Sequence, residues 1–105
     1  MAHTYWISFK ISNEGPFRAT YEGRYQALES AIAFSTKTVL WKETPSFIVF
    51  DTDSDEDAIV AEITKAIDAS ADLAVLCRIG SGAARSVGRF HDEDIFTLMP
   101  FLTAS

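Results

Sequence analysis

Carboxylates are the residues of this chain best placed to do chemistry, because they gather in one short run. Asp51, Asp53, Asp55 and Asp57 alternate along the sequence, as carboxylates do at the start of a calcium-binding loop. Such a loop also needs a glycine at its sharp turn, a terminal glutamate and a helix on each side. Here the glycine is missing and a predicted strand precedes the acids. We therefore interpret them as residues that charge the start of a helix, with Ser54 as its N-cap, and predict no metal site.

Three side chains are candidates for catalysis. Asp51 and Asp53 follow an apolar run, and His91 lies beside Asp92, where it could titrate near neutral pH. No second type of catalytic residue is placed near His91 by sequence spacing. Cys77 is the one cysteine and lies inside an apolar run, which indicates a small buried side chain rather than a nucleophile. A single thiol also fits a reducing compartment.

Net charge argues against nucleic acid as a partner. Lysine and arginine number 9, aspartate and glutamate number 15, and the formal net charge is −6. A phosphate backbone would need a local basic patch. Arg78, Arg85 and Arg89 are the candidates for such a patch. The alternative, which we favour, is that these arginines are scattered and solvate a loop.

Length and composition indicate one globular domain over residues 1–105. The chain is 48% hydrophobic and 23% charged, which is ordinary for a domain with its own core. No apolar run approaches the roughly 20 residues of a membrane span, and no leader peptide is recognisable. We expect a cytoplasmic protein without a membrane partner. The Gly-Ser-Gly run at residues 80–82 lacks the pattern of a nucleotide-binding loop, so no cofactor is predicted.

The order of the apolar segments predicts the fold. Period-two alternation and β-rich runs mark strands, and apolar residues at helical spacing mark helices. The order is that of the ferredoxin-like α+β fold, a βαββαβ two-layer sandwich, here with a C-terminal extension. We expect the six elements at residues 5–11, 24–34, 39–43, 46–50, 55–67 and 73–79, and a short fifth strand at 85–90 before a helical turn that begins at 92.

The most apolar strands are expected at the centre of the sheet. Residues 5–11 and 46–50 are predicted to be neighbours and parallel to each other. Ile7, Val49 and Ile63 are expected in the core, and Arg24 on the polar face of the first helix. Turn-forming residues are found at 13–16, ahead of that helix.

One face of such a sheet has no helices of its own to cover it. Alternation predicts Trp6 and Leu76 on that open face. The C-terminal extension adds apolar residues, among them Ile95 and Phe96. We therefore predict a homodimer with these four residues in its interface. The alternative is that the extension folds back over its own sheet and leaves a monomer.

Two segments carry a resemblance to a known family. Residues 44–51 (TPSFIVFD) lead into the second helix, and residues 72–80 (DLAVLCRIG) form the strand after it. This pattern resembles the small CRISPR-associated Cas-two family and its VapD-type relatives. It covers about residues 5–79, and Ser46 and Phe50 match as structural positions. The chain is also similar to short bacterial proteins labelled SinR-like.

The resemblance implies a ferredoxin-like protomer, a homodimer and a fifth strand that can exchange between protomers. In some members it also implies a metal-dependent nuclease that relies on an aspartate at the end of the first strand. The aligned residue here is Lys10, which cannot ligate magnesium through oxygen.

Two functions follow. The first is a non-catalytic homodimeric interaction module of Cas-two/VapD-like fold, in a defence or toxin–antitoxin context. The alternative is a metal-dependent endoribonuclease or DNA-acting nuclease with a rearranged acidic site that uses Asp51, Asp53 or His91.

Overall fold

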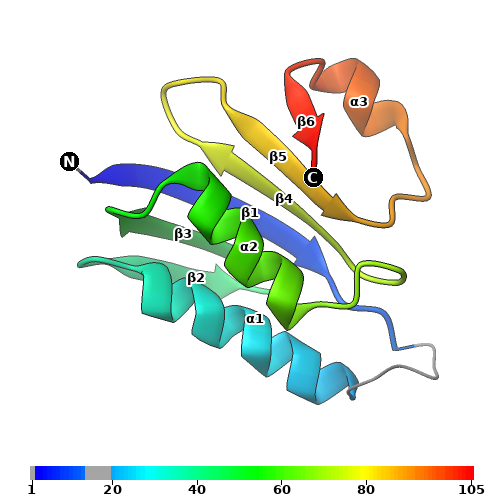
Figure 1. The fold of residues 1–105 in the computed structure, drawn as a ribbon, viewed down its shortest axis with the longest axis horizontal. Helices are drawn as coiled ribbons and strands as arrows, with labels where there is room; N and C mark the ends of the chain where they lie inside the picture. The colour runs from blue at the N-terminus through cyan, green and yellow to red at the C-terminus, as the bar shows by residue number, and fades with distance from the viewer. Residues whose placement is uncertain (1, 14–19) are drawn as a thin grey trace.

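The protein is an α+β structure built on one mixed sheet (Figure 1). The structure is a computed structural model and describes residues 2–13 and 20–105. Of the turn expected at 13–16, residues 14–16 lie outside this description. Within the described residues the elements are β1 (His3–Lys10), α1 (Tyr21–Ser35), β2 (Leu40–Thr44), β3 (Phe47–Thr52), α2 (Glu56–Ala66), β4 (Leu73–Arg78), β5 (Ala84–Gly88), α3 (Asp94–Leu98) and β6 (Leu102–Ala104).

The six strands lie in the order β2-β3-β1-β4-β5-β6. The prediction that β1 and β3 are central neighbours is confirmed, but the prediction that they are parallel is wrong. They are antiparallel, with Ile7 opposite Ile48. The reason is the hairpin between β2 and β3, which reverses the chain at Pro45 and Ser46 before β3 enters beside β1. The parallel pair of this sheet is β5 with β6.

Helices α1 and α2 cover one face of the sheet, and the main core lies between them and β1 (Figure 1). Ile7 and Ile63 are fully buried there, as expected. Val49 is not part of this core, which corrects the prediction. It is opposite Trp6 on the other face of the sheet and only partly buried. Its strand is apolar on both faces, so alternation alone did not show which face the helices cover.

Both long helices begin with a side-chain cap. Thr20 accepts a hydrogen bond from the Gly23 backbone N–H at 3.0 Å, so α1 begins earlier than residue 24. Asp55 accepts one from the Ala58 N–H at 2.8 Å. The N-cap of α2 is therefore Asp55 and not Ser54. Either residue type can cap a helix, and the position of the first turn decides between them.

Arg24 is buried, against the expectation of an exposed position. Its Nε donates to Asp72 Oδ2 at 2.9 Å, and both side chains are almost fully excluded from solvent. Asp72 Oδ1 accepts from the Ser12 backbone N–H at 2.9 Å, and Oδ2 accepts from the Asp68 N–H at 2.8 Å. The carboxylate therefore joins α1, the end of β1 and the turn before β4. A buried charge is tolerated when it is paired and hydrogen-bonded in this way.

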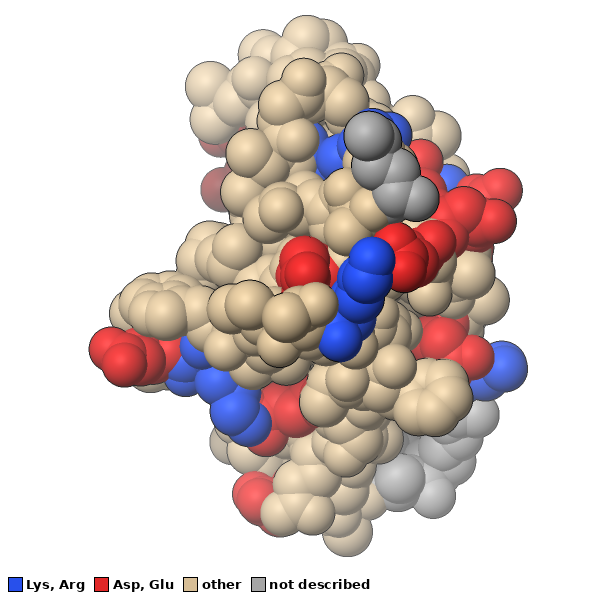
Figure 2. Space-filling view, turned by 90° about the vertical axis from the view of Figure 1, so that its left-hand side faces the viewer, with Lys and Arg blue, Asp and Glu red and all other residues tan. Residues whose placement is uncertain are grey.

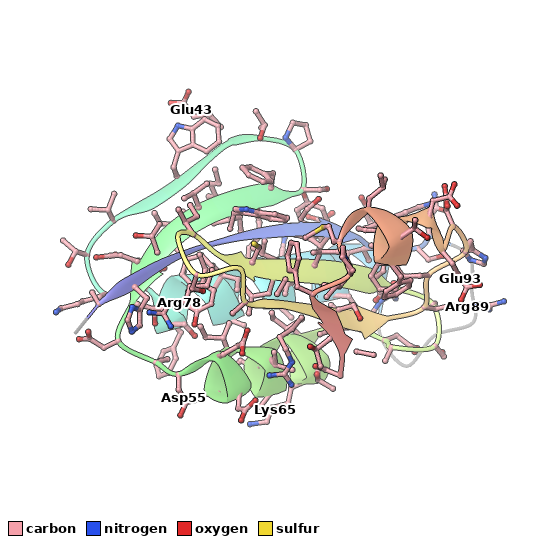
Figure 3. All side chains as sticks on the ribbon, turned by 90° about the horizontal axis from the view of Figure 1, so that it is seen from above. Glu43, Asp55, Lys65, Arg78, Arg89 and Glu93 are labelled. Atoms are coloured by element: carbon pink, nitrogen blue, oxygen red, sulfur yellow. The ribbon has the colours of Figure 1, made fainter. Side chains whose placement is uncertain are left out.

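The C-terminal segment lies on the face of the sheet opposite α1 and α2 (Figure 3). Ile95, Phe96 and Met99 pack there on a second apolar cluster that is centred on Val75 of β4. β6 then pairs with β5 and extends the sheet by one strand. The chain thus covers part of its own open face, as expected from the alternative prediction that the C-terminal extension folds back over its own sheet.

Candidate functional site

An aromatic row crosses three neighbouring strands on the open face. The ring centroids of Trp41 (β2) and Phe47 (β3) are 6.4 Å apart, and those of Phe47 and Trp6 (β1) are 5.9 Å apart. Their strands are adjacent in the sheet. Trp41 and Trp6 are both opposite Val49, and Phe47 lies two positions from Val49 on the same face of β3. The row therefore forms a continuous apolar strip on the side of the sheet away from α1 and α2.

The two ends of this aromatic row have different surroundings. At one end Trp6 packs against the cluster beneath α3, together with Cys77 and Phe96. At the other end Trp41 is 43% exposed, and Val39 beyond it is 64% exposed. A hollow of about 310 Å³ lies beside them. Half of the open face, from β1 to β5, is therefore covered by the chain itself, and the half over β2 and β3 is not.

Leu76 lies outside this face, which corrects its predicted place in an interface. It pairs with Ile7 on the helix-covered side and is fully buried, whereas Cys77 pairs with Trp6 on the open side. Both alternating sets of β4 are apolar, so the sequence carried no signal for choosing between them. Ile95 and Phe96 are partly buried against the chain's own sheet. Of the predicted interface residues, the structure brings Trp6, Ile95 and Phe96 into one cluster.

Burial raises the pKa of the Cys77 thiol above its usual value. The thiol of this partly buried residue therefore stays protonated near neutral pH, which matches the reading of Cys77 as a small packing residue.

The edge strand β2 is poorly suited to pairing with another strand. Lys42 and Glu43 are exposed on it, and its register with β3 shifts between Trp41 and Thr44. Figure 3 shows Glu43 projecting away from the sheet. Charges and irregularities of this kind protect sheet edges from edge-to-edge association. Contact with a partner is therefore favoured through the apolar face and not through the edge.

The acidic candidates for catalysis hold local structure. Asp51 Oδ1 accepts hydrogen bonds from the backbone N–H groups of Val39 at 2.7 Å and Thr38 at 2.9 Å. These two bonds lower the pKa of Asp51 below its usual range. The Asp53 carboxylate forms an ion pair with Lys37 at 3.2 Å. Both aspartates therefore tie the segment before β2 to the end of β3.

These aspartates do not meet His91 or the end of β1. Asp51 is opposite Thr4 near the start of β1, whereas Lys10 is opposite Leu73 at the other end. His91 is exposed in the segment between β5 and α3. Within residues 2–13 and 20–105 no three histidine, cysteine, aspartate or glutamate side chains converge in a way that could hold a metal ion.

The three arginines proposed for nucleic acid are separated. Arg78 Nη2 lies 2.8 Å from His3 Nδ1. Arg85 Nη1 donates to Asp57 Oδ1 at 2.6 Å, so its charge is matched by α2. Arg89 lies at the opposite end of the sheet from Arg78 (Figure 3). Figure 2 shows acidic and basic side chains interspersed on the end of the molecule where Arg78 lies.

Sequence reasoning missed a second hollow, at the end of the sheet where α2 begins. It is lined by Tyr5, Glu56 and Arg78 among others. Tyr5 lies on the same face of β1 as Ile7 and is likewise buried. Only the three-dimensional structure shows that its hydroxyl end lies beside charged residues from two other elements.

Comparison of the chain with protein-family models, with curated proteins and with solved structures finds no match in any of the three. In the described part of the chain, no helix combines the length and the apolar character needed to cross a lipid bilayer.

Proposed function

We propose that this chain is a ferredoxin-like interaction module that forms a homodimer through the uncovered half of its open sheet face, and that it performs no catalytic step of its own. The ferredoxin-like assignment is supported by the element order from β1 to β4 and by the neighbouring strands β2-β3-β1-β4. A defence or toxin–antitoxin role is the part of this proposal that depends on the resemblance to the Cas-two and VapD-type proteins.

The observation that carries the proposal is the aromatic row of Trp41, Phe47 and Trp6. Two of its members lie on β2 and β3, which α3 does not cover, and Val39 and Val49 continue the apolar surface beside them. Exposed contiguous apolar surface of this kind marks interaction sites. A second copy offers the same strip, and a two-fold axis can bring identical strips together.

The face fits a second copy better than a charged macromolecule. The exposed large side chains there are Val39 and Trp41, while the whole chain carries a net charge of −6. Two copies repel at long range, and salt screens that repulsion. Association through an apolar strip should therefore strengthen as the salt concentration rises, whereas binding to nucleic acid would weaken.

Sedimentation equilibrium of the purified chain tests the proposal. We expect a mass near twice 11.6 kDa at micromolar concentration, and a larger dimer fraction when salt is raised. Trp41→Glu should shift the protein toward monomer, because it would bury an unpaired charge in the interface. Phe34→Glu is the matched control, since Phe34 is 89% exposed on α1.

Two results would overturn the proposal. One is a mass that stays near 11.6 kDa at every protein concentration up to about 100 μM. That result would mean a dimer dissociation constant well above about 100 μM, which is too weak for a specific association. The other is a dimer that Phe34→Glu disrupts and Trp41→Glu leaves intact, which would place the interface on the helices.

A further inference from the structure

The hollow beside the start of α2 is separate from the proposed dimer face. It has a volume of about 200 Å³ and is lined by side chains of β1, of the segment that leads into α2, and of β4. Figure 3 shows Arg78 and Asp55 at this same end of the molecule. An inference about this hollow therefore stands independently of the homodimer.

Two residues that line this hollow carry polar atoms whose hydrogen-bonding capacity the chain does not use. Tyr5 is 2% exposed and its side chain lines the hollow. No hydrogen bond joins its hydroxyl to any of the described residues. Glu56 Oε1 is buried and likewise has no hydrogen-bond partner among them. Buried polar groups without partners are rare in folded proteins, and each asks for an explanation such as a bound molecule.

Both signs of charge line the hollow. Arg78 Nη2 lies within hydrogen-bond distance of His3 Nδ1, at 2.8 Å. Asp55 and Glu56 supply carboxylates. Glu56 Oε2 forms an ion pair with Arg85 Nη1 at 3.6 Å, and Oε1 is the oxygen that has no hydrogen-bond partner among the described residues.

The hydroxyl of Tyr5 is suited to donate a hydrogen bond. Burial, and next the charge of Glu56, raise the pKa of Tyr5. The hydroxyl therefore keeps its proton at neutral pH. It can donate to a ligand carboxylate, or accept from a ligand ammonium group through its lone pairs.

We propose that the hollow binds a small zwitterion, a free α-amino acid, with the carboxylate on Arg78 and the ammonium group on Glu56 beside the Tyr5 hydroxyl. A simple anion would meet Asp55 and Glu56, and a simple cation would meet Arg78. A molecule that carries both charges matches both walls. The volume of about 200 Å³ has room for several water molecules, which suits a small amino acid such as alanine, serine or threonine.

A two-dimensional ¹H–¹⁵N NMR titration tests this binding. L-alanine, L-serine and L-threonine are added separately, and propionate and ethylamine serve as probes that carry only one of the two charges. We expect at least one amino acid to shift the amide signals of His3, Tyr5, Glu56 and Arg78 saturably. Its affinity should exceed that of either single-charge probe by about 10-fold, since each charged contact is worth about 1.5 kcal/mol or more.

A matched pair of variants tests the role of the hydroxyl. Tyr5→Phe should weaken amino-acid binding by about 10-fold, the effect of losing one hydrogen bond to a charged group. Tyr25→Phe is the control, because the Tyr25 hydroxyl already accepts from the Ser46 backbone N–H at 3.2 Å and does not line the hollow. The same spectra show whether each variant is folded.

Three outcomes would overturn the inference. The first is the absence of a saturable shift with any of the three amino acids up to about 50 mM, a concentration far above the dissociation constant of a functional site. The second is an affinity for propionate or ethylamine equal to that for the amino acid. The third is amino-acid binding that Tyr5→Phe leaves unchanged. None of these outcomes bears on the homodimer, because the aromatic row lies on the other face of the sheet.

Discussion

Replacing Asp72 with alanine should be among the most damaging single changes in this protein. The side chain of Asp72 is fully buried, and its carboxylate accepts from Arg24 Nε, from the Ser12 N–H and from the Asp68 N–H. Asp72→Ala removes all of these acceptors at once. It takes the charge of Asp72 away from the buried Arg24 guanidinium, whose Nη2 also donates to the Ser12 carbonyl oxygen.

The expected loss follows from this geometry. Breaking a buried ion pair by removing one partner costs about 3–5 kcal/mol. The backbone N–H groups of Ser12 and Asp68 lose their acceptor as well, which places the variant toward the upper end of that range. A domain of this length has a total unfolding free energy of about 5–15 kcal/mol. The variant should therefore lose about a third or more of its stability.

Urea unfolding followed by circular dichroism measures the loss. With a slope of about 2 kcal/mol/M, the midpoint should fall by about 2 M. Lys37→Met is the control, since it breaks the exposed Lys37–Asp53 pair and should cost under about 1 kcal/mol. A loss below about 1 kcal/mol for Asp72→Ala, or one equal to that of Lys37→Met, would refute the reasoning about burial.

Two further predictions concern the backbone near these sites. Gly88 has φ +96°, and a Cβ there would lie 2.0 Å from the Asp72 carbonyl oxygen. Gly88→Ala should therefore lower the free energy of unfolding, measured in urea, by about 3 kcal/mol or more. Gly80→Ala is the control: Gly80 has φ +89° with open space around it, so the cost should be only the conformational strain of about 1–2 kcal/mol. Equal costs for the two variants would contradict the clash. The lowered pKa of Asp51, caused by hydrogen bonds from Val39 and then Thr38, means that its carboxylate stabilises the fold above its unfolded pKa of about 4 and loses this effect as the pH falls through the lower folded value. Asp51→Asn should thus be less stable than the parent protein at pH 7, and its thermal midpoint should fall less steeply below about pH 4. A thermal midpoint that falls below about pH 4 as steeply as that of the parent would count against this role of Asp51.

The order of the elements could be predicted from the sequence because β1 and the two long helices show a period, and β3 and β4 are short apolar runs. Apolar residues recur at every second position from 5 to 11, and the stripe that contains Leu28 and Ile32 repeats at helical spacing. These patterns are local, so they needed no knowledge of the neighbours. The α+β class and the buried positions of Ile7 and Ile63 followed from them.

The features that sequence reasoning missed depend on partners distant along the chain. Leu76 and Val49 lie in strands that are apolar on both sides, so only the register with β1 shows which face each occupies. Arg24 has the composition of an exposed residue, and its burial depends on Asp72, which is 48 positions away. The same holds for the hollow at Tyr5, where three elements converge. Periodicity carries no information on such pairings.

The hydrogen bonds of Asp72 also bear on the sequence of events by which the chain assembles. Its bonds to Ser12 and Arg24 span 60 and 48 positions. Closing such long loops costs chain entropy before any contact repays it. The Asp72 junction should therefore form after the two α–β halves have met, on the native side of the folding barrier. Weakening it would then leave the folding rate nearly unchanged and speed unfolding, so this junction governs how long the folded protein lasts more than how fast it forms.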